Sequence, residues 1–300
     1  MGADRDPLPF QLWRAHSRLA EIGRGPASAL IHRLSEDGGW LWVLGSHART
    51  RPKAEKAEGE RIDLNVLADL KDTRSRCLLA RLPLVNHSGV YDPVRMDGQR
   101  RAGMLPQDHQ GNALAAALAQ DSLLAPFTRI PAKEGGIDIE GIAVSGSRVA
   151  LGMRGPVIGG HGLIVEIEIE ITDQGDLSLA GEPIRRLIAL EGLGVRDLKR
   201  HGDDLLILAG PTTALSGPCA LYRWKNWVTD LPIDPATVSL HRPGRLLEIP
   251  FGRGSDHPEG LALWALEDET TGLMVIYDSP ADHRIDVDAK TVIADIFRLP

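Results

Sequence analysis

The chain has 300 residues, of which 43% are apolar and 25% are charged, and its formal net charge is −7. This is the composition of a soluble globular protein, long enough for one large all-β domain or two ordinary ones. The acidic balance and the lack of a long basic block exclude a nucleic-acid surface, which needs clustered Lys and Arg. No apolar run approaches the roughly 20 residues that cross a bilayer, so we expect no membrane partner.

The two cysteines and the first residues bear on the cellular compartment. Cys77 and Cys219 lie far apart in the sequence, which gives neither a disulfide framework nor a paired metal-ligand spacing. Residues 4–9 are charged or proline-containing, without the apolar centre of a secretory signal. We therefore expect buried free thiols and a cytoplasmic location. The first repeat begins only about 30 residues into the chain, and we expect its blade to be truncated.

The first predicted element is a hairpin over residues 28–47. Two apolar runs flank the segment Ser35 to Gly39, whose Asp-Gly and Gly-Gly steps suit a tight turn. The charged segment 48–74 follows, with little apolar periodicity, and we expect a long exposed loop or a short helix there. Residues 77–85 resemble a third strand.

Residues 86–136 interrupt the pattern. Gly, Pro, Asn and Asp occur at both ends, and the run 113–119 consists of Ala and Leu with one Asn before it, a composition that favours a helix. The segment is either a degenerate blade or an insertion, and we favour a helical insertion near residues 112–124.

From residue 137 onward the strands are regular. Residues 165–170 alternate Ile or Val with Glu, the period of a strand with one wet face. Two successive units of four strands are predicted: 139–144, 148–153, 161–171 and 183–190, and then 195–199, 204–209, 220–224 and 245–249.

One pattern recurs four times along the chain. Each copy opens a first strand with an apolar residue followed by a polar one, and the copies begin at Ile31, Ile139, Val195 and Pro258. Units of four antiparallel strands that repeat in this way are typical of a β-propeller. We predict an all-β, single-domain propeller over residues 1–300, with about five or six blades. A β-sandwich is the main alternative. Ring closure would place residues 285–299 near the N-terminal segment, because open sheet edges promote aggregation.

The repeated polar position supplies the first candidate site. The first strand of each propeller blade lies nearest the axis, so His32, Glu140, Arg196 and Glu259 are predicted to line one central funnel. Such a ring could bind a ligand, hold a hard cation or polarise a water. The alternative, which we weight more heavily, is that these charges pair with one another and hold the blades together.

Polar residues also gather where strands end. Arg154 precedes Gly-Pro and Asp278 precedes Ser-Pro, so both are expected at a rim, where ligands often bind; ordinary turn chemistry explains them equally well. His257 lies beside two carboxylates and could act as an acid or base, although a hydrogen-bonding role is commoner. The candidate ligand-binding residues of funnel and rim are His47, Glu140, Arg154, Arg196, Asp197, His257, Glu259 and Asp278.

Several phrases of the chain resemble a bacterial family catalogued as domain of unknown function 3616. The resemblance covers about residues 29–280 and is carried by residues 45–49, 133–143, 154–156, 194–198, 221–224 and 258–261. It implies a propeller similar in outline to phytase-like esterase propellers, without an established activity. Members usually have an acidic residue followed by Gly where this chain has His32-Arg33.

Function is less constrained than fold. The chain has no G-x-S-x-G elbow, no P-loop and no H-E-x-x-H helix, so the question of catalysis stays open. The leading hypothesis is a propeller that binds a small or anionic ligand in its polar funnel. One alternative is a metal-assisted hydrolase of phosphate or carboxylic esters, in which Glu140, Glu259 and Asp278 hold Ca²⁺ or Mg²⁺ and Arg154 or Arg196 steadies the anion. Another is a protein-interaction scaffold that uses segments 48–74 and 86–136.

Overall fold

The computed structural model describes residues 31–51, 63–71, 74–213, 215–231, 234–268 and 270–299. The chain divides into two compact units. The first comprises residues 1–139, 144–149 and 167–183, and the second comprises residues 140–143, 150–166 and 184–300. The helices among the described residues are all too short or too polar to cross a membrane.

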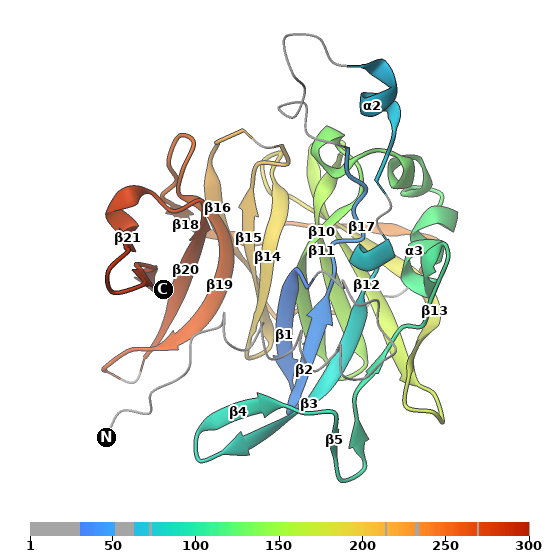
Figure 1. The fold of residues 1–300 in the computed structure, drawn as a ribbon, viewed down its shortest axis with the longest axis horizontal. Coiled ribbons are helices and arrows are strands. Elements are labelled where there is room, and N and C mark those ends of the chain that lie inside the picture. Colours follow the sequence, from blue (N-terminus) through green and yellow to red (C-terminus); the bar gives the residue numbers. More distant parts are fainter. Residues whose placement is uncertain are drawn as a thin grey trace. The chain divides into compact units, whose positions relative to one another are not determined.

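Four sheets of mainly antiparallel strands follow one another along the chain, and most strands that are successive in the sequence are neighbours in their sheet (Figure 1). This is how the blades of a β-propeller are built, so the predicted all-β propeller class is confirmed. The described residues hold four such blades, where the sequence predicted about five or six.

The first sheet contains β1 (Arg33–Asp37), β2 (Trp40–Leu44), β3 (Leu79–His87) and β4 (Val90–Pro93), with β7 (Gly103–Met104) beside β3. The predicted hairpin is β1 and β2, in which Asp37 pairs with Trp40. Gly38 and Gly39 form its two-residue turn with φ of 57° and 79°. Two successive positive φ angles define the turn type that matches strand twist, and glycine adopts them without strain.

The predicted insertion, residues 86–136, supplies β4 and β7 of the first sheet and also contains a helix before the second sheet begins. Its helix is α3 (Ala113–Gln120), capped by Asn112, whose Oδ1 accepts a hydrogen bond from Ala115 N at 3.0 Å. The short helix α2 (Leu64–Ala68) forms within segment 48–74, of which residues 52–62 and 72–73 lie outside the described part. A scaffold role for these two segments stays a prediction. The short elements of this region are η2 (Arg74–Arg76), β5 (Met96–Asp97), β6 (Arg100–Arg101), β8 (Gln107–Asp108), β9 (Gly111–Asn112), η3 (Ala125–Arg129) and η4 (Ala132–Glu134).

The second sheet is larger than predicted. It contains β10 (Asp138–Ser145), β11 (Arg148–Ile158), β12 (His161–Ile171) and β13 (Leu177–Ile188), the four predicted strands. A fifth strand, β17 (Val238–His241), pairs in parallel with the end of β13, with Arg185 opposite Val238. The sequence analysis did not find β17, because three of its four residues are exposed and it has no buried alternation.

The third and fourth sheets belong to the second unit. The third is β14 (Gly194–His201), β15 (Asp204–Gly210), β16 (Cys219–Trp224) and β18 (Gly244–Ile249), as predicted. The fourth has three strands, β19 (His257–Ala265), β20 (Thr271–Asp278) and β23 (Asp295–Arg298). Between β20 and β23 lie η5 (Asp282–Arg284) and the hairpin of β21 (Ile285–Asp286) and β22 (Thr291–Val292). The sequence predicted that residues 285–299 lie near the N-terminal segment, which is outside the described residues.

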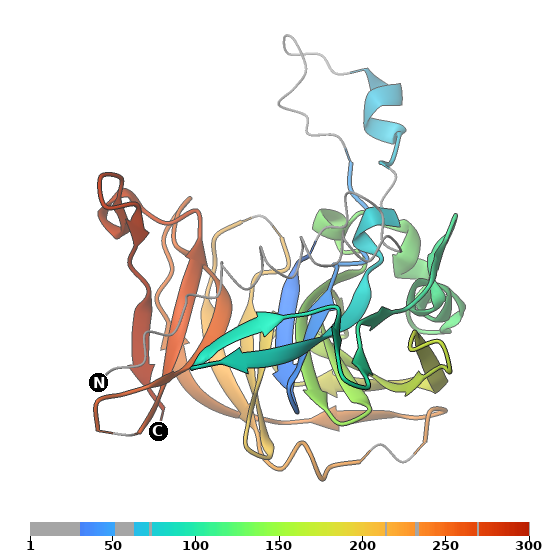
Figure 2. The same ribbon diagram turned by 60° about the horizontal axis from the view of Figure 1, so that its bottom comes forward.

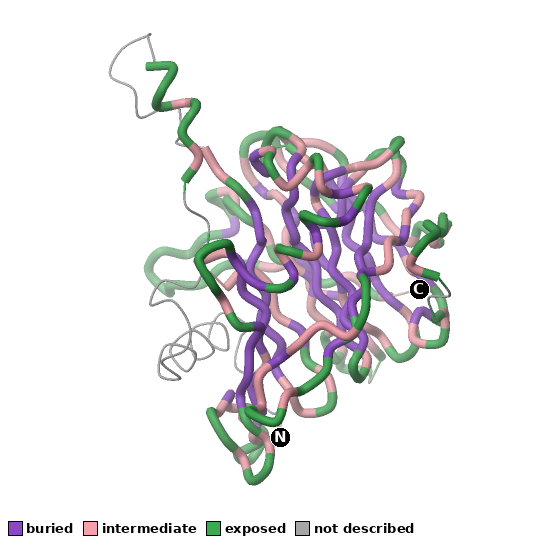
Figure 3. The backbone as a smooth tube through the Cα atoms, turned by 90° about the vertical axis from the view of Figure 1, so that its right-hand side faces the viewer, coloured by how far each residue is buried: buried purple, intermediate pink, exposed green. Residues whose placement is uncertain are grey.

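Buried residues run along the strands and exposed ones gather at the turns (Figure 3). Within the second unit, Ala143, Ile164 and Ile188 share one apolar cluster with the faces of β14, β15 and β16. A second cluster joins β15 and β16 to β19 and β20 through Leu208, Leu261 and neighbouring side chains. The strands β14 and β19 lie side by side, as Figures 1 and 2 both show. This packing fixes the innermost strands that carry the candidate site.

Candidate functional site

Two of the predicted funnel residues lie at irregularities of the innermost strands. The pairing of β14 with β15 shifts register between Val195 and Asp197, which leaves Arg196 at a β-bulge. The pairing of β19 with β20 shifts in the same way between Pro258 and Gly260, at Glu259. A bulge bends the strand and re-aims a side chain. The repeated polar position of the sequence is therefore the place where the ladder is interrupted in both strands.

Glu140 lies between two guanidinium groups. Its Oε1 accepts a hydrogen bond from Arg154 Nη1 at 2.9 Å, and its Oε2 lies 3.3 Å from Arg196 Nε. The Glu140 side chain is 3% exposed, and those of Arg154 and Arg196 are 12% and 6% exposed. A carboxylate buried this deeply stays ionised at low cost only when cations neutralise it, and here two do so.

Arg196 continues the network toward solvent. Its Nη2 donates to Glu259 Oε1, and the Glu259 side chain is 27% exposed. The loop after β15 holds both arginines from the other side: Arg196 Nη1 donates to Pro211 O at 3.4 Å and Arg154 Nη2 donates to Thr213 O at 2.6 Å. The arginine cluster, defined as Glu140, Arg154, Arg196 and Glu259, is thus a chain of alternating charges that starts buried and ends half-exposed.

Asp197 joins two neighbouring strands. Its Oδ1 accepts from Leu198 N at 2.8 Å within β14, and its Oδ2 accepts from Leu261 N of β19 at 2.7 Å. Both carboxylate oxygens therefore accept backbone N–H groups, and the residue is buried. This arrangement gives Asp197 a structural task in holding β14 against β19.

His257 and Asp278 lie opposite each other at the ends of β19 and β20. His257 is half-buried, and its Nε2 lies 3.2 Å from the hydroxyl of Ser216. Asp278 is exposed. Cys219, the first residue of β16, is buried, and burial raises the pKa of its thiol to about 11 although the charge of Arg196 opposes the shift. The thiolate form is therefore negligible at neutral pH.

His47 lies in the first unit and is buried. Its Nδ1 is 3.0 Å from Gly45 O and its Nε2 is 3.3 Å from Asn112 Oδ1. The same Asn112 oxygen caps α3, and Asn112 Nδ2 donates to Cys77 O. Burial lowers the pKa of His47 to about 4, outweighing the two hydrogen bonds that raise it. His47 is thus a neutral side chain that ties the end of the first sheet to the insertion.

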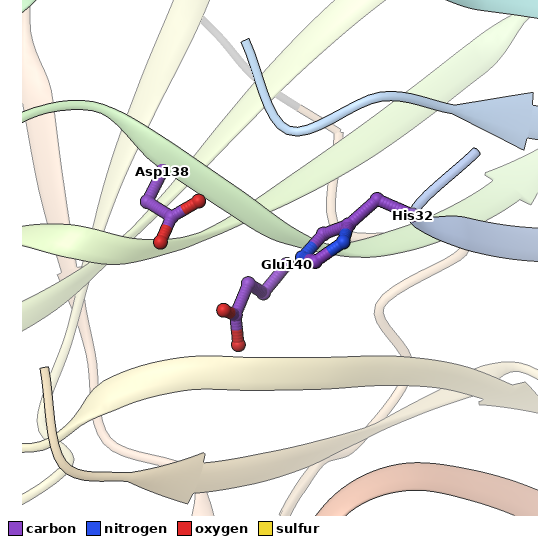
Figure 4. Close-up of side chains that lie close together, drawn as sticks. All are labelled: His32, Asp138 and Glu140. Atoms are coloured by element: carbon purple, nitrogen blue, oxygen red, sulfur yellow. The ribbon is translucent and has the colours of Figure 1, made fainter. Parts of the chain in front are cut away.

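One group of metal-ligating side chains occurs among the described residues. One ligand atom each from His32, Asp138 and Glu140 lies within 4.8 Å of the other two (Figure 4), and Asp138 and Glu140 are two positions apart on β10. An imidazole with two carboxylates suits a first-row transition metal better than Ca²⁺ or Mg²⁺, which prefer oxygen alone. The predicted ligand set of Glu140, Glu259 and Asp278 forms no such group in the described part and stays a prediction.

One family model matches most of the chain. The model described as protein of unknown function (DUF3616) matches residues 23–295. The chain belongs to the DUF3616 family. The resemblance noted from the sequence is thereby confirmed, and so is the description of an uncharacterised propeller.

Other comparisons add little for this DUF3616 member. A comparison with curated proteins finds no match. Among solved structures, a mutant of the Bombyx mori GH32 β-fructofuranosidase BmSUC1 in complex with sucrose aligns at 11% identity with a TM-score of 0.34. The alignment covers 97% of this chain and 56% of that one. At this TM-score the likeness supports no inference about function.

Sequence reasoning missed the loop residues of the site. Pro211 and Thr213 contribute backbone carbonyls, which any residue type could supply. Ser216 lies outside the repeated pattern, and no motif marks it. Only the three-dimensional approach of this loop to β19 brings it to His257, so the DUF3616 sequence alone carries no local signal for it.

Proposed function

We propose that this DUF3616 member binds a small anionic ligand at the arginine cluster, with the ligand's carboxylate or phosphate replacing Glu259 on Arg196. Guanidinium groups present paired N–H donors whose geometry matches both kinds of anion. The proposal concerns binding alone.

One observation carries the proposal: of the two carboxylates that pair with Arg196, that of Glu140 is buried and that of Glu259 is partly exposed. Glu140 is almost fully buried and is shared with Arg154, so it is a fixed part of the site. Glu259 is 27% exposed and touches Arg196 through one nitrogen, Nη2. Because the Glu259 side chain is partly exposed, water can solvate its carboxylate when it leaves, so breaking this ion pair costs less than breaking the buried pair with Glu140. The Nη2 edge of Arg196 is therefore the part of the cluster that an external anion can take over.

Preorganisation supports the same assignment. Arg154 and Arg196 each donate to Glu140 or lie against it, and each also donates to a carbonyl of the loop after β15. A guanidinium that is already fixed loses little conformational freedom when a ligand binds. The bulge at Arg196 further fixes where the side chain leaves the strand.

The test is thermal unfolding and calorimetric titration with inorganic phosphate and with acetate, each matched to sodium chloride at equal ionic strength. Native-state binding raises the unfolding temperature by mass action, by several degrees at concentrations about a hundredfold above Kd. Glu259→Gln should bind about tenfold more tightly, because it removes the competing charge, a difference of about 1.4 kcal/mol. Arg196→Lys should lose most of the effect, because Lys cannot reproduce the forked contact.

Arg245→Gln is the matched control. Arg245 is an exposed cation of the same unit that pairs with Glu248, itself 81% exposed, so its loss should leave anion binding unchanged. Equal responses of wild type, Arg196→Lys and Arg245→Gln would reject the proposal, and so would the absence of any response to either anion.

The metal-assisted alternative rests on the group of His32, Asp138 and Glu140. It is separated from the anion proposal in the same assay by adding Mn²⁺, Zn²⁺, Ca²⁺ or Mg²⁺ without phosphate. A rise in unfolding temperature that Asp138→Asn removes would favour a metal site, since Asp138 is not a member of the arginine cluster.

We further propose that the protein works in the cytoplasm. Cys77 and Cys219 are both buried and form no disulfide with each other, and disulfides are rare in reducing compartments. Fractionation of cells that express the chain with a C-terminal tag would test this location.

A further inference from the structure

Ser216 and His257 form a hydrogen-bonded pair where two loops of the second unit meet. Ser216 lies on the loop between β15 and β16, and His257 opens β19. Ser216 Oγ is 3.2 Å from His257 Nε2, and the backbone N–H of Gly254 donates to the same Oγ at 3.0 Å. Since Gly254 N–H occupies one lone pair of the oxygen, the hydroxyl proton is available for the imidazole whenever Nε2 carries no proton.

We propose that Ser216 is a nucleophile and His257 its general base, and that the pair hydrolyses small carboxylic esters through an acyl-serine. A serine hydroxyl is a weak nucleophile until an adjacent base takes its proton, and a base within about 3.2 Å meets the geometric requirement. This inference rests on the proposed function in one respect: the arginine cluster would hold an anionic group of the substrate. The loop that carries Ser216 also supplies the backbone carbonyls that fix Arg154 and Arg196.

The residue before His257 is held from several sides. Asp256 has a φ of 51°, a left-handed conformation that is uncommon outside glycine. Its Oδ1 accepts from Ala281 N at 2.7 Å, its Oδ2 lies 3.1 Å from Arg284 Nε, and its own N–H donates to Ser279 O. Backbone strain persists only where the surroundings enforce it, and it gathers at functional sites. Asp256 is therefore a positioning residue that fixes the backbone from which the His257 side chain extends.

Arg284 extends this support. Its guanidinium binds both oxygens of Asp295, at 3.0 and 2.9 Å, and stacks 4.2 Å from the ring centroid of Tyr277. Tyr277 in turn donates to Asp295 at 2.6 Å. The loop that carries Asp256 is thus anchored to η5, β20 and β23 by one connected set of contacts, the kind of supporting shell that holds a catalytic side chain in place.

Exposed apolar side chains on the same two loops indicate the acyl group. Leu215, next to Ser216, is 76% exposed, and Phe251, in the loop that carries Gly254, is 42% exposed. Apolar side chains of this size on the loops that carry the pair favour a short apolar acyl chain over a polar one. The substrate class is therefore an ester of a short aliphatic acid.

The reaction balances without a cofactor. Ser216 Oγ bonds to the ester carbonyl carbon while its proton passes to His257 Nε2; the ester C–O bond then breaks, and the leaving alcohol takes that proton with the bonding electron pair. Water adds to the acyl-serine and gives a proton to Nε2, the carboxylic acid leaves, and Ser216 Oγ regains the proton. The negative charge of the tetrahedral intermediate develops on the ester's carbonyl oxygen, and Gly254 N–H, 3.0 Å from Oγ, is a backbone donor beside this reacting centre.

The test uses the full chain, a fluorophosphonate probe and p-nitrophenyl butyrate. Tandem mass spectrometry should locate the phosphonyl adduct on Ser216 of the wild-type chain, a result that needs no variant. Ser216→Ala should abolish labelling and ester hydrolysis. His257→Gln should slow both by at least about a hundredfold, the usual contribution of a general base. Ser255→Ala, in the loop that carries Gly254, should change neither.

The inference is overturned if the wild-type chain takes up no probe and hydrolyses no ester, or if the adduct maps elsewhere. It is also overturned if His257→Gln is labelled as fast as wild type while its unfolding temperature is unchanged. Because the probe carries no carboxylate or phosphate anion, labelling does not depend on the arginine cluster. Anion binding without labelling would reject the serine pair alone, and labelling without anion binding would reject the proposed function alone.

Discussion

Glu140 shows how one residue can be both buried and charged in this molecule. Its two carboxylate oxygens face different arginines, Arg154 at 2.9 Å and Arg196 at 3.3 Å. Removing one partner of a buried ion pair costs about 3–5 kcal/mol, because the other charge stays uncompensated. Glu140 nevertheless keeps one cation if either arginine is lost. The shared carboxylate therefore lets Arg196 exchange its outer partner while the inner part of the cluster stays intact.

His47 gives a pH prediction at the same scale. The ring faces two acceptors, Gly45 O and Asn112 Oδ1, so the neutral form can donate to only one of them. The folded pKa of about 4 lies below the ordinary histidine pKa of 6.5, so the unfolded state binds more protons between these two pH values. Stability is full above about pH 6.5 and falls as the pH drops toward 4, by about 3 kcal/mol from this residue.

Urea unfolding of wild type and His47→Asn at a series of pH values measures the effect. Asn tolerates the positive φ of 52° at this position, and the variant should lose the part of the slope that His47 supplies. His241, whose pKa is lowered by burial and by Arg186, contributes in the same direction in both proteins. His109→Asn, at an exposed site, should keep the wild-type slope. Parallel slopes for His47→Asn and wild type would contradict the assignment.

At the residue scale, sequence reasoning succeeded where the chain repeats itself. Glu140, Arg196 and Glu259 occupy one repeated position, and the structure connects them by ion pairs. It failed for Ser216, because a loop residue has no counterpart in the other repeats. The tie between Asp197 and Leu261 was likewise invisible, since a backbone N–H leaves no trace in the sequence.

At the scale of elements, glycines determine how closely the sheets of the second unit approach. A Cβ on Gly194 at the start of β14 would lie 2.0 Å from Arg154 O, and one on Gly152 of β11 would lie 2.4 Å from Val195 Cγ1. A Cβ on Gly141 would meet Leu198 Cγ at 2.7 Å. Close packing against β14 therefore requires a glycine at position 141, directly after Glu140. This spacing allows Glu140 and Arg154 to reach Arg196.

We expect Gly194→Ala to destabilise the protein by about 1–3 kcal/mol or more, because the added methyl group meets backbone, which cannot rotate away. Chemical denaturation measures the loss. Gly244→Ala is the matched control: Gly244 also opens a strand of the third sheet, but its added Cβ has no heavy atom within 4 Å. That variant should be neutral or slightly more stable. Equal costs for the two substitutions would show that close approach is not the reason for Gly194.

The strands were predictable to different degrees for a physical reason. Buried strands such as β12 and β15 carry apolar runs or alternation, and the sequence located both. The parallel strand β17 is held by hydrogen bonds to β13 while its side chains stay largely exposed. A strand whose side chains are mostly exposed or polar has no hydrophobic pattern to detect.

At the scale of the whole molecule, the long gap between the first two repeats explains why the sequence predicted more blades than the four found among the described residues. The first strands of the later units begin 56 residues apart, from Ile139 to Val195, whereas Ile31 and Ile139 are 108 residues apart. Dividing the chain by the shorter spacing suggests an extra blade. The structure fills the gap with α3 and short two-residue strands instead, as the Ala- and Leu-rich composition of residues 113–119 indicated.

Cooperative unfolding is expected for the whole molecule, because single strands contribute residues to both compact units. The boundary passes through strands: β10 is divided after Ile139 and again after Ala143, and β12 is divided after Glu166. β10 and β12 are each one continuous strand of the second sheet. We therefore expect one two-state transition for the chain, as for a single domain over residues 1–300.

Pulsed hydrogen exchange read by mass spectrometry tests this at increasing urea. Peptides from β2 and β3, in the first unit, should lose protection at the same midpoint as peptides from β15 and β16, in the second. Gly194→Ala, a change within the second unit, should lower both midpoints by the same amount, whereas Gly244→Ala should leave both in place. If Gly194→Ala moved only the β15 and β16 midpoint, the shared strands would not couple the units, and the chain would fold as two independent domains.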